Sequence, residues 1–161
     1  MSWPRAVGAV LVAATFVGTV GCFAPTSNTE RLTDAARELN LSARFGRLEL
    51  AASHAAPAVR QDFLARRAQW GESIRVLDVE LASLDIDDDA GEALVEVDVS
   101  WILISESTLR GTRIAQQWKE MDGDWLLTRE KRVSGDIGLF GEQVETPAQR
   151  PDVHFSSKTI R

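Results

Sequence analysis

The spacing of apolar residues changes from three or four to two near Gly71, and this change constrains the fold more than any other feature of the sequence. A spacing of three or four places apolar side chains on one face of a helix, whereas a spacing of two places them on one face of a strand. Helical segments therefore precede extended segments along the chain. Helices followed by consecutively connected antiparallel strands predict an α+β fold.

The sequence before Gly71 contains two amphipathic patterns. One continuous helix is expected over residues 30–53, with an apolar stripe on one face. A second helix is expected from Pro57, which suits the first helical position, to Gly71, which can end a helix. The first stripe consists of Leu32, Ala36, Leu39, Ala43, Gly46 and Leu50, widened by Leu41, Phe45 and Leu48, and the second of Val59, Phe63, Leu64, Ala68 and Trp70.

Four segments after Gly71 alternate apolar and polar residues and are predicted to form strands. Ile74 and Val76 have the opposite phase from the apolar residues that follow, which predicts a bulge near Val76. Asp122-Gly123 favours a tight hairpin, and residues 86–92 favour a longer one. The prediction is therefore two N-terminal helices packed on a curved, four-stranded antiparallel meander. The alternating residues are Leu77, Val79, Leu81; Val95, Val97, Val99, Trp101; Ile114, Trp118; and Trp125, Leu127.

Residues 1–21 have the pattern of a secretory signal. Arg5 precedes the uncharged, largely apolar segment 6–20, and small residues follow it, as in such signals. Gly21 and Cys22 match the processing site of bacterial lipoproteins, while Thr19 stands where leucine is usual. Cys22 is thus the expected lipidation site. An uncleaved membrane anchor and an ordinary soluble secretory signal are the alternatives.

Cys22 is the single cysteine of the chain, so its acylation would leave no thiol for a disulfide. Residues 22–29 would then form a lipidated tether to a membrane of the cell envelope. In some bacteria an aspartate directly after the lipidated cysteine is a retention signal. Phe23 stands at that place here instead of aspartate, which favours the periplasmic side of the outer membrane.

The remaining sequence is long enough for one core. One domain is expected over residues 30–141, and a disordered or loosely docked tail over residues 142–161, which contain Pro147 and Pro151. The formal net charge is −6, and losing Arg5 with the signal makes it more negative. This charge argues against nucleic acid as a partner and against a basic membrane-binding patch.

The last predicted hairpin reads Gln-Trp-Lys-Glu-Met-Asp-Gly-Asp-Trp-Leu-Leu over residues 117–127. Together with two helices and curved strands, it resembles the closing hairpin of the nuclear transport factor 2-like (cystatin-like) superfamily, over roughly residues 30–133. The resemblance implies a cone-shaped α+β domain. It implies no single activity, because this scaffold hosts isomerases, dehydratases and cyclases as well as transport factors and non-catalytic envelope modules.

Enzymes of that superfamily usually place an aspartate or histidine inside the cone. Here His54 falls near the helix junction and His154 lies in the tail, so no histidine–carboxylate pair follows from the spacing. General acid–base catalysis needs a titratable group within reach of the substrate. No catalytic residue and no cofactor is therefore assigned. A non-catalytic binding domain is the leading hypothesis, and a small-molecule isomerase, dehydratase or cyclase is the alternative.

Two motifs have weaker functional interpretations. Asp85, Asp87, Asp89 and Glu96 have the spacing of a calcium loop, but they lie in a strand–turn–strand context that favours a solvated acidic hairpin, and no metal site is assigned. Residues 135–141 contain three glycines spaced by three. Because this segment follows a strand and opens no helix, we expect it to cover the open end of the cone or to contact a partner.

Four tryptophans follow the signal segment, and core packing is their default role. A pocket for an apolar ligand is the alternative, lined by Trp101, Trp118, Ile114 and Phe63. Residues 101–104 are apolar on both faces of a strand, which indicates that both faces of the sheet are covered. We therefore expect a protein partner or a homodimer through the outer sheet face.

Overall fold

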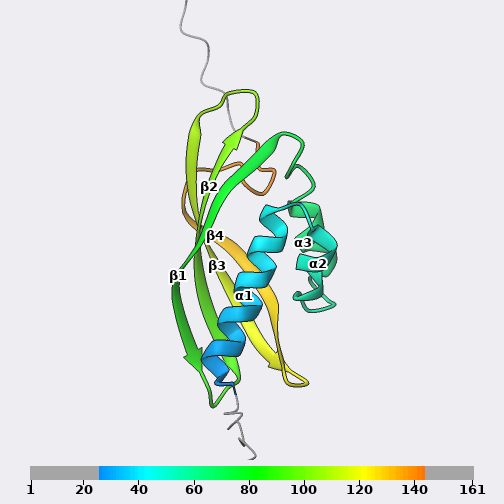
Figure 1. Cartoon of the computed structure of the whole chain (residues 1–161), viewed down its shortest axis with the longest axis vertical. Coiled ribbons are helices and arrows are strands. Elements are labelled where there is room, and N and C mark those ends of the chain that lie inside the picture. The colour runs from blue at the N-terminus through cyan, green and yellow to red at the C-terminus, as the bar shows by residue number, and fades with distance from the viewer. Residues whose placement is uncertain (1–25, 144–161) are drawn as a thin grey trace, which may run out of the picture.

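Three helices precede a four-stranded antiparallel sheet in the computed structural model, which describes residues 26–143. The helices are α1 (Asn28–Arg44), α2 (Leu48–Ser53) and α3 (Arg60–Arg66). The strands are β1 (Ile74–Asp87), β2 (Glu92–Leu103), β3 (Leu109–Met121) and β4 (Asp124–Gly135), in the order β1-β2-β3-β4. Helix α1 runs along one face of the sheet, and α2 and α3 lie on the side of β4 (Figure 1). The predicted α+β meander is confirmed.

The helical region differs from the expected single helix over residues 30–53. Helix α1 ends at Arg44, and Gly46 has a φ of +74°, a conformation that glycine adopts without strain. The amide of Gly46 donates to the carbonyl of Ala43 (3.0 Å), which closes the last turn. Phe45, expected in the buried stripe, is 64% exposed at this break. The chain then turns into the short helix α2.

The second helix is shorter than expected. Pro57 lies in a turn before α3, which covers Arg60–Arg66, and residues 67–69 form another turn. Phe63 and Trp70 are nevertheless buried as predicted. Apolar spacing located the buried face but not the helix ends, because turns can present the same face as a helix.

A capping box begins α1. The hydroxyl of Ser27 accepts from the amide of Glu30 (3.2 Å), and the Glu30 carboxylate accepts from the amide of Ser27 (3.0 Å). Further along, Asn40 and Gln116 of β3 exchange two hydrogen bonds of 3.0 Å, and both residues are buried. A buried polar pair with both members satisfied fixes where α1 docks on the sheet.

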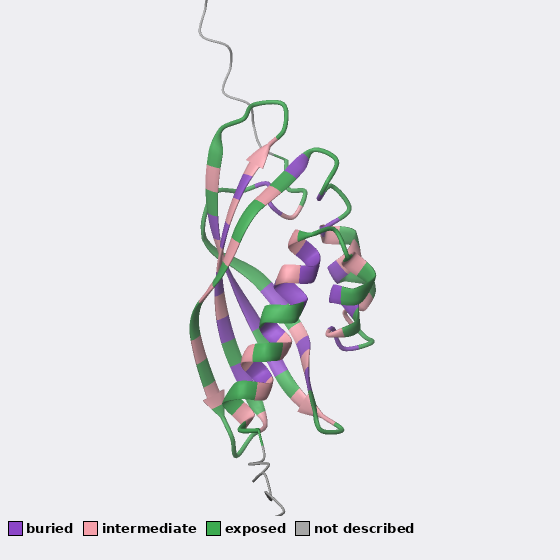
Figure 2. Cartoon of the chain, in the orientation of Figure 1, coloured by how far each residue is buried: buried purple, intermediate pink, exposed green. Residues whose placement is uncertain are grey.

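The four strands are long and curved, and their inner face forms the core. Register shifts occur in β1 at Val76/Asp78 and at Leu81/Ser83, so the predicted bulge near Val76 is confirmed. The predicted turns also hold, since β1 and β2 are joined by residues 88–91 and β3 and β4 by Asp122-Gly123. Buried residues alternate along β2 (Figure 2), and they belong to the same core cluster as the buried residues of the helices. Within the described residues, the helices thus cover the inner face of the sheet.

Gly135 ends β4 with a φ of +86°, and a Cβ there would lie against the carbonyl oxygen of Gly111 and 2.9 Å from Thr112 Cα. We expect Gly135→Ala to lower the free energy of unfolding by about 2–3 kcal/mol, because it adds a backbone collision to the strain of positive φ. Gly123→Ala is the matched control, since Gly123 has a φ of +89° with open space around it. Equal losses for the two variants in urea unfolding would contradict the prediction.

Several sequence-based predictions fall outside residues 26–143. The signal segment, the lipidation site Cys22, most of the tether and His154 with the rest of the tail after Gln143 are among them. Of the helices within the described range, none has the length and apolar character required to cross a bilayer.

Candidate functional site

The space between helices and sheet is filled by large side chains. Trp101, Trp118, Ile114 and Phe63, the predicted lining of an apolar pocket, all belong to the buried core. Trp101 Nε1 donates to Thr112 Oγ1 (2.9 Å), which fixes its indole. Only Phe63 and Trp118 border a surface cavity, and they border different ones. The structure therefore places these four side chains together as packing.

A buried ion pair lies at the α3 end of this core. Arg67 is 0% exposed, and its guanidinium meets the carboxylate of Glu130 on β4 with two hydrogen bonds, one of them 2.8 Å long. The Arg67 guanidinium carbon lies 3.8 Å from the ring centre of Phe63 and 4.9 Å from that of Trp70. Two-point pairing and aromatic stacking suit arginine and not lysine. Arg67 and Glu130 are titratable groups inside the core, and their pairing has a structural role.

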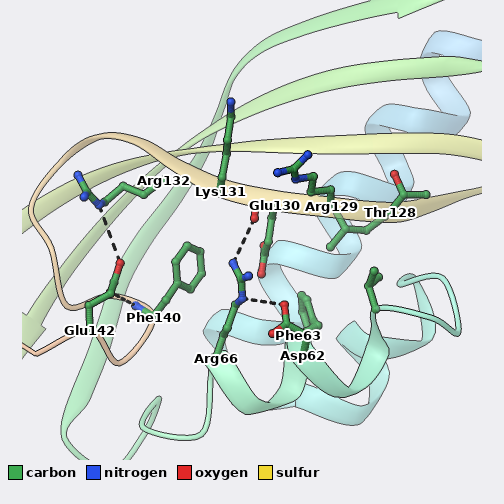
Figure 3. Close-up of a pocket in the computed structure, with 12 residues that line it drawn as sticks. Asp62, Phe63, Arg66, Thr128, Arg129, Glu130, Lys131, Arg132, Phe140 and Glu142 are labelled. Atoms are coloured by element: carbon green, nitrogen blue, oxygen red, sulfur yellow. Dashed lines mark hydrogen bonds and ion pairs between the residues drawn. The ribbon is translucent and has the colours of Figure 1, made fainter.

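A cavity of about 460 Å³ lies between α3, β4 and the loop after β4 (Figure 3). We call it the α3–β4 cavity. Its floor is partly apolar, and its rim carries both signs of charge. The lining consists of Val59, Asp62, Phe63 and Arg66 on the α3 side, residues 127–132 of β4, and Phe140 and Glu142 of the loop.

Most of the charges around the α3–β4 cavity are engaged locally. Arg66 pairs with Asp62 (2.8 Å) and donates to the carbonyl of Glu130 (3.1 Å). Within the described residues, neither Arg129 nor Lys131 has an ion pair or a side-chain hydrogen bond, and both side chains extend from the side of β4 opposite to α3 (Figure 3). The outer face of β4, beside the α3–β4 cavity, thus offers two cations, Arg129 and Lys131, to a ligand or partner.

The loop after β4 closes one end of the domain. Leu139 is fully buried, and its carbonyl accepts from Trp70 Nε1 (2.8 Å). Glu142 holds the loop by accepting from the amides of Gly138 (3.0 Å) and Phe140 (2.9 Å). Leu139 and Phe140 of this segment pack against the core, whereas Ile137 is 40% exposed.

The outer sheet face carries charges that are sorted by strand. Rows of paired residues run across the sheet with acids toward β1 and cations toward β4. Shallow cavities of about 350 and 400 Å³ lie on this face and share Leu94 and Gln117. Leu94 is 40% exposed and Val133 is 48% exposed. The rows are Asp85–Leu94–Gln117–Arg129, Ser83–Glu96–Ala115–Lys131, Asp87–Glu92–Lys119–Leu126 and Glu80–Asp98–Arg113–Ser134.

One carboxyl of this face has a shifted pKa. Both carboxylate oxygens of Asp98 accept from Arg113 at 2.7 Å, and these hydrogen bonds lower the pKa of Asp98 below its ordinary value. The same contacts raise the pKa of Arg113. Because both groups remain charged across the physiological range, they form a fixed ion pair and not an acid–base couple.

The acidic hairpin is shaped by local hydrogen bonds. Asp87 Oδ1 accepts from the amide of Ala90 (3.0 Å), and Asp88 Oδ1 accepts from Asn28 Nδ2 (2.9 Å). Glu96 lies within β2, opposite Ser83, and not in the loop. Across residues 26–143, no three His, Cys, Asp or Glu side chains are grouped closely enough to hold a metal ion.

Sequence reasoning missed three inner-face polar residues: Gln116, Arg67 and Glu130. Gln116 has the same strand phase as Ile114 and Trp118, and alternation alone would have placed it inside. Arg67 lies between Phe63 and Trp70 on one helical stripe. Glu130 gave no such signal, because register shifts in β4 change its phase relative to Leu127. His54, expected at a helix end, is the C-cap of α2.

No protein-family model matches the chain, and neither does any curated protein. Among solved structures, an NTF2-like protein from Cytophaga hutchinsonii aligns with a TM-score of 0.53 at 13% identity, over 68% of this chain and 99% of that one. The chain has a nuclear transport factor 2-like fold. A SEC-C motif containing protein from Rhodopseudomonas palustris aligns equally well, with a TM-score of 0.53 at 15% identity, over 62% of this chain and 77% of that one.

A third solved structure, a protein of unknown function with a cystatin-like fold from Nostoc punctiforme, aligns with a TM-score of 0.47 at 14% identity, over 66% of this chain and 91% of that one. Identities this low describe the fold alone, since one scaffold carries many unrelated functions. Any functional residue of this nuclear transport factor 2-like domain has to be argued from its own geometry.

Proposed function

We propose that this protein is a lipid-anchored component of a bacterial cell envelope whose domain binds partners through its surface without catalysing a reaction. The observation that carries the binding role is the filled interior, where Trp101, Trp118 and Ile114 occupy the space between sheet and helices. Catalytic and small-molecule sites normally need a concave space lined by convergent polar groups. In this interior Asn40 and Gln116 hydrogen-bond to each other, and so do Arg67 and Glu130, although Arg67 Nε has no partner among the described residues.

The anchor is supported by Gly21-Cys22 after an uncharged apolar segment. Several acyl chains on one cysteine hold a protein at a bilayer far more firmly than one chain does. Helix α1 begins at Asn28, so five residues separate it from Cys22. The domain would therefore work close to the membrane surface, on the periplasmic side of the outer membrane.

Replacing Cys22 with serine tests the anchor. The wild-type chain is expected in the membrane fraction after a high-salt wash and the Cys22→Ser chain in the soluble fraction, because the variant has no acylated thiol. Incorporation of a clickable fatty acid should be lost in the same variant, and Thr26→Ala, four residues further on, should behave as wild type. Retention of Cys22→Ser in the membrane would show that the N-terminal segment itself is the anchor.

The outer sheet face fits a second copy of the chain, because its charges complement themselves. A two-fold axis parallel to the strands would place β1 of one protomer over β4 of its partner. Asp85 would then face Arg129, at opposite ends of one row. Exposed Leu94 would lie between these charges. The two-sided apolar segment 101–104 points to the same covered face.

Sedimentation tests this dimer. The full chain in detergent is expected to dimerise at 50 mM salt and to dissociate progressively toward 1 M salt, since exposed ion pairs are screened. Asp85→Lys should weaken the dimer, and adding Arg129→Asp to it should restore the dimer by exchanging the charges. Asp34→Lys, at an exposed position of α1, is the control. A monomer at low salt and high concentration would rule the dimer out.

A further inference from the structure

The free side of β4 is an unpaired sheet edge beside a cavity. β4 is the last strand of the sheet. The edge of β4 that faces away from β3 is paired at Leu127, whose carbonyl accepts from the amide of Ala56 (2.9 Å) and whose amide donates to the carbonyl of His54 (2.9 Å). Beyond Leu127, the carbonyl of Glu130 accepts from Arg66 (3.1 Å). No other backbone partner is present on this side in the described part of β4.

One contact identifies which backbone groups of β4 are free. Residues 129–132 all lie opposite residues of β3, and the carbonyl of Glu130 accepts from Arg66 on the side of α3. The backbone groups of Glu130 therefore point away from β3, and because such groups alternate between the two sides of a strand, those of Arg132 do so too. The amides of Glu130 and Arg132 and the carbonyl of Arg132 are therefore available to an added strand.

We propose that this edge binds an extended, acidic segment of a partner protein by strand addition. An edge strand with unpaired backbone groups is a template for another chain, and proteins use such edges for peptide recognition. The α3–β4 cavity, of about 460 Å³, gives the added strand room between β4 and α3. This proposal adds a second partner to the surface-binding role proposed above and rests on it; because Arg129 also lies in the proposed dimer interface, an added strand and a second copy of the chain would compete for it.

The side chains around the edge define the sequence that fits. Side chains of an added strand would alternate between the two faces. On the outer face they would lie beside Arg129 and Lys131, the cations without an ion pair among the described residues. On the inner face they would meet Phe63 and Phe140, which line the cavity. A segment that alternates acidic and apolar residues satisfies both faces.

The charges left free at this edge favour an acidic partner. Asp62 pairs with Arg66 and Glu130 with the buried Arg67, whereas Arg129 and Lys131, on the outer face of β4, have no ion pair within the described residues. Arg132 has a weak contact with Glu142, whose Oε1 lies 3.9 Å from Arg132 Nε. Charge complementarity of this kind directs both partner choice and orientation.

The test uses the full chain in detergent and a fluorescent eight-residue peptide that alternates glutamate and valine. Binding is expected in fluorescence anisotropy, and amide hydrogen exchange should slow about tenfold or more at Glu130 and Arg132. The amides of Arg129 and Lys131, which alternate with these and point toward β3, should change little. A peptide with N-methyl groups on every residue can donate no backbone hydrogen bonds along either side and should not bind. A lysine–valine peptide should not bind either.

Matched charge reversals locate the site. Arg129→Glu/Lys131→Glu should weaken the peptide about tenfold or more, whereas Arg113→Glu/Lys119→Glu, which reverses two cations of the same face on β3, should leave it within about twofold. Equal losses in the two double variants would overturn the proposal in favour of general attraction to the outer face. Slowed exchange elsewhere than at Glu130 and Arg132 would also overturn it.

A chain ending at Gln143 separates this proposal from occupation by the protein itself. It should bind the peptide as tightly as the full chain does. Binding that occurs only after this truncation would show that residues 144–161 occupy the edge, which overturns the partner proposal. Absence of peptide binding would leave the result for Cys22→Ser unchanged, so this proposal and the envelope-anchored role can fail separately.

Discussion

Glu130→Ala is expected to lower the free energy of unfolding by about 3–5 kcal/mol, because it leaves the Arg67 guanidinium buried without its counter-ion. The rings of Phe63 and Trp70 lie against the Arg67 guanidinium and offer no acceptor that could replace the carboxylate. Urea unfolding, monitored by the fluorescence of the tryptophans, measures the change. The paired variant Arg67→Met/Glu130→Leu removes both charges together and should recover most of the loss.

An exposed ion pair of the same region is the control for Glu130→Ala. Asp62→Ala removes the partner of Arg66, and both of these side chains are at least a third exposed. Its expected cost is at most about 0.5 kcal/mol, because solvent screens such pairs. A Glu130→Ala variant that unfolds within about 1 kcal/mol of wild type would show that water reaches Arg67, and the pair would then not be structural.

Trp101→Ala is expected to lower the free energy of unfolding by about 3–5 kcal/mol, since it removes a fully buried indole from the centre of the core. It also leaves Thr112 Oγ1 without the donor it accepts from at 2.9 Å. Leu109→Ala, at a side chain that is 68% exposed, should change stability by about 0.5 kcal/mol or less.

The Trp101 variant also discriminates between packing and ligand binding. If the interior were an open pocket, Trp101→Ala would cost little stability and an apolar ligand would stabilise the wild-type chain strongly. A filled interior predicts the reverse, with a cavity created by the mutation that small apolar probes can enter. Thermal shifts with indole, measured on both chains, separate the two cases.

Local pattern predicted the elements that depend on neighbours in sequence. The alternation of Val95, Val97 and Val99 placed β2 and its buried face, and Asp122-Gly123 placed the last hairpin. The phase change at Val76 located a bulge. These features follow from side-chain period and turn conformation, which are properties of a few consecutive residues.

The candidate site depended on contacts that no local pattern encodes. Arg67 and Glu130 are 63 residues apart, and a bulge in β4 decides that Glu130 faces inward. Trp70 and Leu139, joined by a hydrogen bond, are 69 residues apart. The predicted pocket residues Trp101, Trp118, Ile114 and Phe63 came together as packing, which composition could not distinguish from a ligand site.

The sequence by itself determined that helices precede strands, the meander and the buried face of β2, because periodicity sorts side chains between core and solvent one element at a time. Only the tertiary structure decided that side chains fill the space between helices and sheet, and that β4 is an edge strand with a cavity beside it. It also decided where the unpaired cations lie. Those features come from strand register and from long-range docking, which local periodicity leaves open.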